Sequence, residues 1–138
     1  MREATSADQW RIWRIVLGAG LDPTDLHWSH FLIAEHDGQI AGVGQIRPAA
    51  RELGSLVVLP AYRGQGVGGL LIEALVARTD GDVYLECNAT LAPYYARYGF
   101  IEIEPAQAPL VLRRKAVLGA RLAMWFGMRL AVMKRPAD

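Results

Sequence analysis

The chain begins with apolar residues at helical spacing. These residues are Trp10, Ile12, Trp13, Val16 and Leu17. Their spacing predicts a first helix that ends at the Gly18-Ala19-Gly20 run. Thr5 or Ser6 is expected to be the N-cap at the start of this helix, and Ser6 with Gln9 three positions later fits a capping box. Met1–Ala4 is long enough only for a brief edge strand.

Three apolar runs then predict a meander of strands over residues 31–35, 39–46 and 51–59. Asp37-Gly38 joins the first two runs and is a strong hairpin signal. Gly42 and Gly44 fall on one face of the second run, so we expect another backbone or a ligand to approach closely there.

Helices and strands alternate in the second half. A helix over 66–79 joins the meander to a strand over 83–87, which is therefore expected to run parallel to the strand before it. The side chains that this helix is expected to bury are Leu70, Leu71, Ala74, Leu75 and Ala77. A short helix (91–98), a strand (100–104), a further helix (110–126) and a last strand (130–134) follow. This order predicts an α+β (α/β) fold.

Length and composition limit the classes of protein. A chain of 138 residues with 52% apolar residues is expected to form one domain, 1–138, with its own core. The single Cys87 has no disulfide partner, and three scattered histidines form no metal-ligand cluster, so we expect no metal. Met1–Trp10 is polar, which argues against a secretory signal and favours a cytoplasmic protein. Arg121 and Arg129 interrupt the apolar stretch 116–133, so we expect no membrane span.

Charge is unevenly distributed along the chain. Residues 1–104 hold 8 Lys/Arg and 13 Asp/Glu, whereas residues 105–138 hold 7 Lys/Arg and one acidic residue, Asp138. The basic segment is either a solvated helix face with ordinary packing or a patch that receives an anionic substrate, partner or surface. Nothing in the sequence indicates nucleic-acid binding.

A glycine-rich loop follows the third strand: Arg63-Gly64-Gln65-Gly66-Val67-Gly68-Gly69. A strand, a glycine loop and a helix start in this order form a phosphate site, because glycines let backbone amides approach an anion and the helix dipole favours it. The Walker pattern needs Lys-Ser/Thr after its last glycine, and Leu70 stands there instead.

The dinucleotide fingerprint fits this loop only in part. Gly64, Gly66 and Gly69 match its spacing, and Glu86 lies about 20 residues on, where a ribose-binding acid is expected. However, Pro60–Arg63 separates the strand from the loop, where that motif requires a tight turn. The antiparallel meander before the loop is also wrong for that fold.

Arg63-x-x-Gly66-x-Gly68, after a strand ending in Val-Leu-Pro, resembles motif A of the GNAT superfamily of acetyl-CoA-dependent N-acetyltransferases. Asn88, seven residues before Tyr95, with the sequence YARYGF ending at Phe100, resembles the family's second motif, N…YxxxGF. The resemblance covers roughly residues 1–104. It implies a mixed, mostly antiparallel central sheet flanked by helices, to which this chain adds an extra C-terminal helix before the last strand.

The resemblance also implies the chemistry. Two strands, 51–59 and 83–87, would splay apart around the pantetheine arm of acetyl-CoA, with Leu56, Val57 and Val58 on the cofactor side through their backbone groups. One backbone N–H would stabilise the oxyanion as an amine attacks the thioester. The backbone amides from Gly64 to Gly69 would bind the pyrophosphate. Arg63, the first residue of the motif, would also belong to the cofactor site. Asn88 would lie near the pantetheine arm.

Catalytic residues are implied in the same way. Tyr95 aligns with the tyrosine that donates a proton to the leaving thiolate, while a core ring on a short helix is the structural alternative. Glu52 matches the position of a strand glutamate that serves as the general base in some members, although an exposed strand glutamate fits equally. Glu86, His27, His30 and a water chain are other candidates for the base. Cys87 is expected to be a small buried residue with no covalent role.

The acceptor is the open question. Family resemblance implies transfer of the acetyl group to a primary amine on a small molecule or on a protein or peptide. The basic segment 110–126 departs from the usual layout and would wall off the acceptor site, form a homodimer contact or cover a sheet edge. A non-catalytic acyl-CoA-binding or regulatory module is the main rival function, and a dinucleotide-dependent oxidoreductase is the other.

Overall fold

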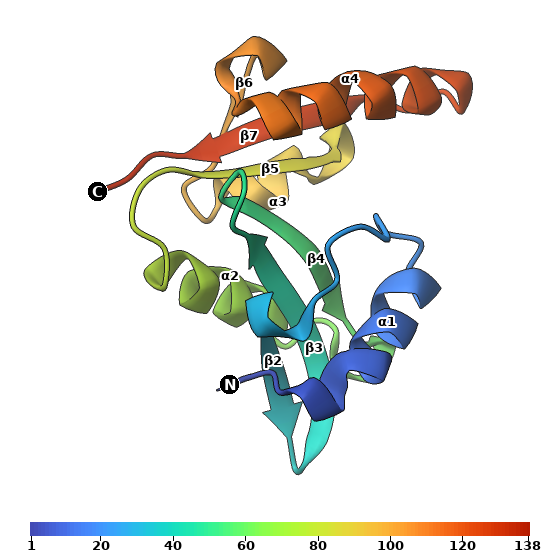
Figure 1. The fold of residues 1–138 in the computed structure, drawn as a ribbon, viewed down its shortest axis with the longest axis vertical. Coiled ribbons are helices and arrows are strands. Elements are labelled where there is room, and N and C mark those ends of the chain that lie inside the picture. Colours follow the sequence, from blue (N-terminus) through green and yellow to red (C-terminus); the bar gives the residue numbers. More distant parts are fainter. The chain divides into compact units, whose positions relative to one another are not determined.

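A computed structural model describes the backbone of residues 1–138 and the side chains of all of them except Ala120, Arg121 and Ala123. The chain forms two compact units (Figure 1). Unit 1 comprises Met1–Arg47 and Leu53–Arg78, and unit 2 comprises Pro48–Glu52 and Thr79–Asp138. A single domain over the whole chain stays a prediction.

Unit 1 is built on a meander of antiparallel strands with one helix on each side, as Figure 1 shows. Its elements are β1 (Arg2–Glu3), α1 (Gln9–Gly18), β2 (Phe31–His36), β3 (Gln39–Arg47), β4 (Glu52–Val58, of which Glu52 belongs to unit 2) and α2 (Val67–Ala77). The hairpin predicted at Asp37-Gly38 is confirmed: β2 and β3 pair antiparallel, and both turn residues have positive φ, 51° and 75°.

The two faces of β3 determine where the helices of unit 1 pack. Val43 faces the side of α1, in a cluster with Ile12 and Val16 of that helix. Gly42 and Gly44 face the other side, where α2 lies close to the strand. The close approach that the two glycines predict is therefore confirmed, and the approaching groups belong to β4 and α2.

Two expectations for the helices of unit 1 are wrong. Leu70 is 64% exposed, and Ile72 is buried in its place. Ala77 is also exposed. The capping box is formed by Thr5 and Asp8, not by Ser6 and Gln9. Asp8 takes this role because its Oδ2 accepts the Thr5 amide hydrogen at 2.8 Å and also pairs with Arg2 Nη1 at 2.8 Å.

Unit 2 holds the remaining strands and the basic helix. Its elements are β5 (Val83–Asn88), α3 (Ala92–Ala96), β6 (Ile101–Ile103), α4 (Leu110–Trp125) and β7 (Leu130–Arg135). β7 pairs antiparallel with both β5 and β6. Leu112 and Ala116 bury one side of α4 against Tyr84 and Val132 of the strands.

The hydrogen-bonded strand order is β1-β2-β3-β4-β5-β7-β6. β4 and β5 are parallel, as predicted, and meet where Glu52 faces Tyr84. The predicted fold class is confirmed: a mixed, mostly antiparallel sheet of seven strands with helices, including the extra helix α4 before the last strand.

Candidate functional site

The glycine loop of unit 1 leads directly into α2. Gly64 and Gly66 have φ values of 78° and 81°, which side chains with a Cβ rarely adopt. Gly66 is the N-cap of α2 and has no side chain to cap the helix. The first amides of α2 lack intrahelical partners by geometry, so they remain available to an anion that also benefits from the helix dipole.

Close packing holds this helix start in place. A Cβ on Gly42 would lie 3.2 Å from Val67 Cγ1 and 3.1 Å from Leu71 Cδ1, so α2 is seated directly on the backbone of β3. Gly68 and Gly69 are buried in the first turn. The N-terminal end of α2 is thus closely packed within unit 1.

The residues before the loop have distinct environments. Val57 is buried in the core of unit 1, whereas Leu56 and Val58 are half-buried. Arg63 is exposed, and its Nε donates a hydrogen bond of 3.1 Å to the Val58 carbonyl. Gln65 reaches back to the Ala61 carbonyl at 3.5 Å. Arg63 therefore braces the end of β4 against the loop.

A buried polar cluster shapes β4, and no pattern in the sequence predicts it. Ser55 has a φ of 52° in the middle of the strand. Its hydroxyl oxygen accepts hydrogen bonds from Gln45 Nε2 at 2.9 Å and Arg47 Nη2 at 3.2 Å. Arg47 also lies 3.8 Å from Asp22 Oδ2. The cluster holds Ser55 in this backbone conformation immediately before Leu56.

In unit 2, Asn88 shapes the turn that follows β5. Its side-chain oxygen accepts hydrogen bonds from the amide and the hydroxyl of Thr90, both at 3.0 Å. Its Nδ2 lies 3.7 Å from Met128 Sδ. Asn88 thereby caps the short helical turn that leads into α3, and cofactor contact by this residue stays a prediction.

Tyr95 projects from α3 into an aromatic group. Its ring centroid lies 5.2 Å from that of Tyr94 and 6.1 Å from that of Phe100. Burial, assisted by Cys87 and Tyr94, raises the pKa of Tyr95 to about 12. The hydroxyl proton therefore remains in place at neutral pH. Because an ordinary thiol has a pKa of about 8.5, Tyr95 suits hydrogen-bond donation to a thiolate better than complete proton transfer.

Glu52 is buried at the start of β4, in unit 2. Lys115 of α4 approaches both carboxylate oxygens at 3.4 Å. The Lys115 ammonium therefore lies beside the carboxylate that the sequence offers as a base. A general-base role for Glu52 thus stays a prediction, and Lys115 is a partner that sequence spacing did not indicate.

The other candidate bases are dispersed. His27 and His30 belong to unit 1, where their ring centroids are 5.9 Å apart and the His27 ring accepts a hydrogen bond from the Ser29 amide. Glu86 belongs to β5 of unit 2. Cys87 beside it is half-buried rather than buried, and desolvation with nearby Glu102 and Glu86 raises its pKa to about 11. The thiol is therefore protonated and a poor nucleophile at neutral pH.

Within the part of the chain that is described, no group of His, Cys, Asp or Glu side chains is arranged to hold a metal ion. Among the same residues, no helix is both long enough and apolar enough to cross a bilayer.

A glycine-capped loop that leads into a helix, within a mixed and mostly antiparallel sheet, is the arrangement that the motif resemblance predicts for a CoA-dependent acyltransferase. Residues 27–102 match the family model described as acetyltransferase (GNAT) domain. The chain belongs to this family. No curated protein matches the chain.

Several solved structures have a similar fold. N-acetylglutamate synthase from Neisseria gonorrhoeae, complexed with coenzyme A and N-acetyl-glutamate, is 19% identical with a TM-score of 0.81 over 99% of this chain and 34% of its own. Rv2747 from Mycobacterium tuberculosis, in complex with CoA, is 21% identical with a TM-score of 0.78, and the match covers 99% of this chain and 98% of Rv2747. Escherichia coli ElaA is 17% identical with a TM-score of 0.68, and the match covers 96% of this chain and 93% of ElaA. The chain spans about a third of the Neisseria synthase.

Proposed function

We propose that this protein transfers an acetyl group from acetyl-CoA to a primary amine by direct attack on the thioester. The observation that carries the proposal is the start of α2, where Gly66 leaves the first helical amides without a side-chain cap. A pyrophosphate is the natural ligand for such a helix end. Family membership and the coenzyme A bound to two of the similar structures support the same ligand.

The reaction balances without a covalent enzyme intermediate. The neutral amine attacks the thioester carbonyl, the C–N bond forms, and the negative charge passes to the carbonyl oxygen. A backbone N–H of β4 at Leu56 or Val58 would stabilise that oxyanion. Collapse breaks the C–S bond and releases the thiolate, while the ammonium proton passes to a base.

Tyr95 would donate a hydrogen bond to the departing thiolate. Its raised pKa of about 12 keeps the hydroxyl protonated across the physiological range. Glu52 would accept the amine proton directly or through water only if its pairing with Lys115 loosened when substrate binds. Glu86 and a water chain remain the alternative groups that could take up the amine proton.

The acceptor we propose is a small amine such as an amino acid. The Neisseria synthase carries N-acetyl-glutamate in one structure and L-arginine in another, and the fold likeness extends over 99% of this chain. Thiol release from acetyl-CoA, measured with a panel of amino acids, polyamines and peptides, tests this assignment. Turnover only with peptides would contradict it, and binding without turnover on any acceptor would support a non-catalytic module.

Cofactor binding is tested by calorimetry with acetyl-CoA. Gly66→Glu should abolish binding, because the new carboxylate repels the pyrophosphate and φ at this position is 81°. Gly127→Glu is the matched control, with a φ of 71°, no neighbouring atom within 4 Å and a place in unit 2 outside the loop. The assignment is wrong if the wild type does not bind acetyl-CoA or if both variants lose binding equally.

A further inference from the structure

Unit 1 contains a cavity of about 650 Å³ that has no assigned ligand group, although Val57 and Arg63 of the predicted cofactor site belong to its lining. α1, the β2–β3 turn and the end of β4 surround it, and Pro60 and Arg63 connect its wall to the glycine loop. Its volume lies in the range of small-molecule sites. The lining residues that determine its chemistry are Trp10, Arg11, Arg14, Ile15, Ile40 and Arg63.

The arginines of unit 1 divide into two groups. In one group, each arginine forms an ion pair with a carboxylate; its members are Arg2, Arg47 and Arg78. The other three all line this cavity, and none has a carboxylate within 4.0 Å among the described side chains: Arg11, Arg14 and Arg63. No Asp or Glu of the described residues lines the cavity.

This segregation is unexpected on electrostatic grounds. Unit 1 as a whole has seven acidic residues and six arginines, so carboxylates are available. Three cations at the wall of one cavity, with no carboxylate among the described residues that line it, favour an anion there. The cavity is therefore electropositive inside a unit that is slightly acidic.

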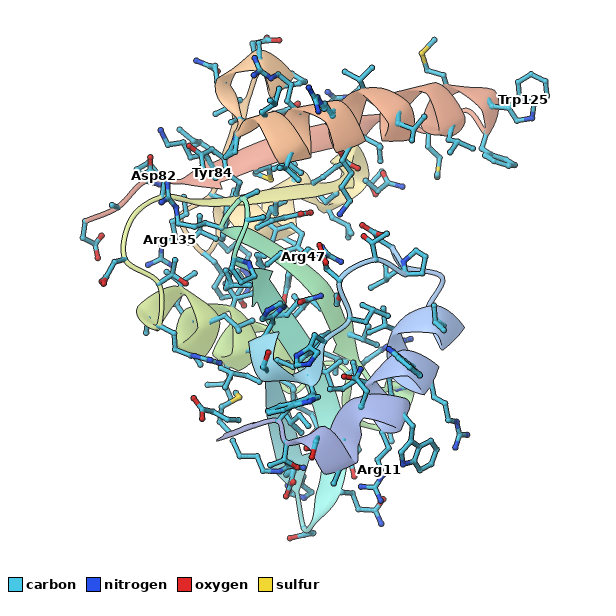
Figure 2. All side chains as sticks on the ribbon, viewed as in Figure 1. Arg11, Arg47, Asp82, Tyr84, Trp125 and Arg135 are labelled. Atoms are coloured by element: carbon cyan, nitrogen blue, oxygen red, sulfur yellow. The ribbon has the colours of Figure 1, made fainter. Side chains whose placement is uncertain are left out.

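The cavity wall also has an aromatic part. The guanidinium carbons of Arg11 and Arg14 lie 5.8 and 5.3 Å from the Trp10 ring centroid, which orients both cations on one side of α1. Figure 2 shows Arg11 projecting from this helix. Ile15 and Ile40 supply apolar lining, so the ligand that fits has an organic body as well as negative charge.

We propose that this cavity binds an organic phosphate, with the phosphate group on the arginines and the apolar body against Trp10. A phosphate monoester carries up to two negative charges and three acceptor oxygens, which suits several guanidinium groups better than one carboxylate does. Two ligands have this chemistry. One is the 3′-phosphate end of the CoA cosubstrate, and this assignment rests on the proposed function. The other is a separate phosphate ester.

The test uses adenosine 3′,5′-bisphosphate, which lacks the pantetheine arm, as the calorimetric probe. Arg14→Ala should weaken its binding about tenfold, because one charge-assisted hydrogen bond is lost at an exposed site. Arg97→Ala is the matched control, since Arg97 also lies over a ring, 5.9 Å from the Tyr98 centroid, but belongs to unit 2. Trp10→Ala and Trp13→Ala form a second pair, because both rings are about half exposed and only Trp10 lines the cavity.

Each outcome has a distinct meaning. No binding to the wild type, or equal affinity in Arg14→Ala, overturns the proposal. If Arg14→Ala weakens CoA but not dephospho-CoA, the site is occupied by the 3′-phosphate of the cosubstrate. If CoA binding does not depend on Arg14 while bisphosphate binding does, the ligand is a separate phosphate ester. Failure of acetyl-CoA to bind would remove the proposed function and leave the bisphosphate result intact.

Discussion

Replacing Gly42 by alanine tests how α2, and with it the glycine loop, packs against β3. The new Cβ would lie 2.9 Å from the Val57 carbonyl oxygen, 3.1 Å from Leu71 Cδ1 and 3.2 Å from Val67 Cγ1. The nearest of these is a backbone atom in a neighbouring strand, which cannot rotate away. Overpacking of this kind costs about 1–3 kcal/mol.

Part of that cost is offset in the unfolded chain. Gly42 is in a strand and has no positive φ, so alanine can adopt its backbone conformation. Losing the glycine's freedom in the unfolded state contributes about 0.4–1 kcal/mol in favour of folding. Combining the two effects, the expected net destabilisation of Gly42→Ala is about 1–2 kcal/mol.

Gly18→Ala provides a control with the same chemical change and the opposite sign. Gly18 is the last residue of α1, and no heavy atom lies within 4 Å of the position that an alanine methyl group would take there. Alanine is favoured over glycine in a helix by about 1 kcal/mol, with less effect at a helix end. We expect Gly18→Ala to stabilise the protein by about 0.5 kcal/mol.

Urea denaturation of the two variants and the wild type measures both effects. For a chain of 138 residues, about 1 kcal/mol corresponds to roughly 3–4 °C in Tm, so thermal unfolding is an independent check. Acetyl-CoA binding to Gly42→Ala should also weaken, since Val67 begins α2. Equal stability of Gly42→Ala and the wild type would refute this account, because α2 would then not lie against β3 at these distances.

Three further predictions concern single side chains. Tyr95→Phe should lower turnover about ten- to a hundredfold with acetyl-CoA affinity unchanged, as measured by steady-state kinetics and calorimetry; an unaltered rate removes Tyr95 from the mechanism. Arg2 lowers the pKa of Asp8 from 3.8 to about 2, so Asp8 stabilises the fold by about 2 kcal/mol above pH 4 and loses this as pH falls towards 2. Urea titrations of Asp8→Asn should therefore differ from the wild type at pH 7 and converge near pH 2, whereas exposed Asp37→Asn should match it throughout. Cys87, with its pKa raised to about 11, should react with iodoacetamide at pH 8 far more slowly than free cysteine, and Cys87→Ala should keep full turnover; rapid alkylation would contradict the raised pKa.

Local backbone chemistry made parts of this protein predictable. Asp37-Gly38 predicted a hairpin, and both residues have the positive φ that such a turn requires. Gly64 and Gly66 predicted a tight loop before the helix, and both also have positive φ, while anion binding by this loop stays a prediction. These features depend on neighbouring residues alone, so a short stretch of sequence determines them.

The orientation of α2 was not predictable in the same way. Its sequence is apolar on nearly every side, so helical spacing did not distinguish the buried face from the exposed one. Packing against Gly42 and Gly44 buries Leu71 and Leu75, and leaves Leu70 exposed. The buried face was decided by the partner surface, which lies about 30 residues earlier.

The charge partners depend even more on the tertiary structure. Glu52 was a candidate base by its place on a strand, and its pairing with Lys115, 63 residues later, was not indicated by the sequence. Arg11 and Arg14 belong to no motif in the sequence, so nothing indicated a binding role for them. The structure adds that they line the same cavity as Arg63.

The amino-acid sequence alone was enough for the order of elements, the glycine loop and the family, because periodicity, turn chemistry and short motifs are local. The tertiary structure decided which helix face is buried, which carboxylate has a cationic partner and which arginines share a cavity. Burial and electrostatic energy depend on distances through space, and these arise only when segments remote in the sequence pack together.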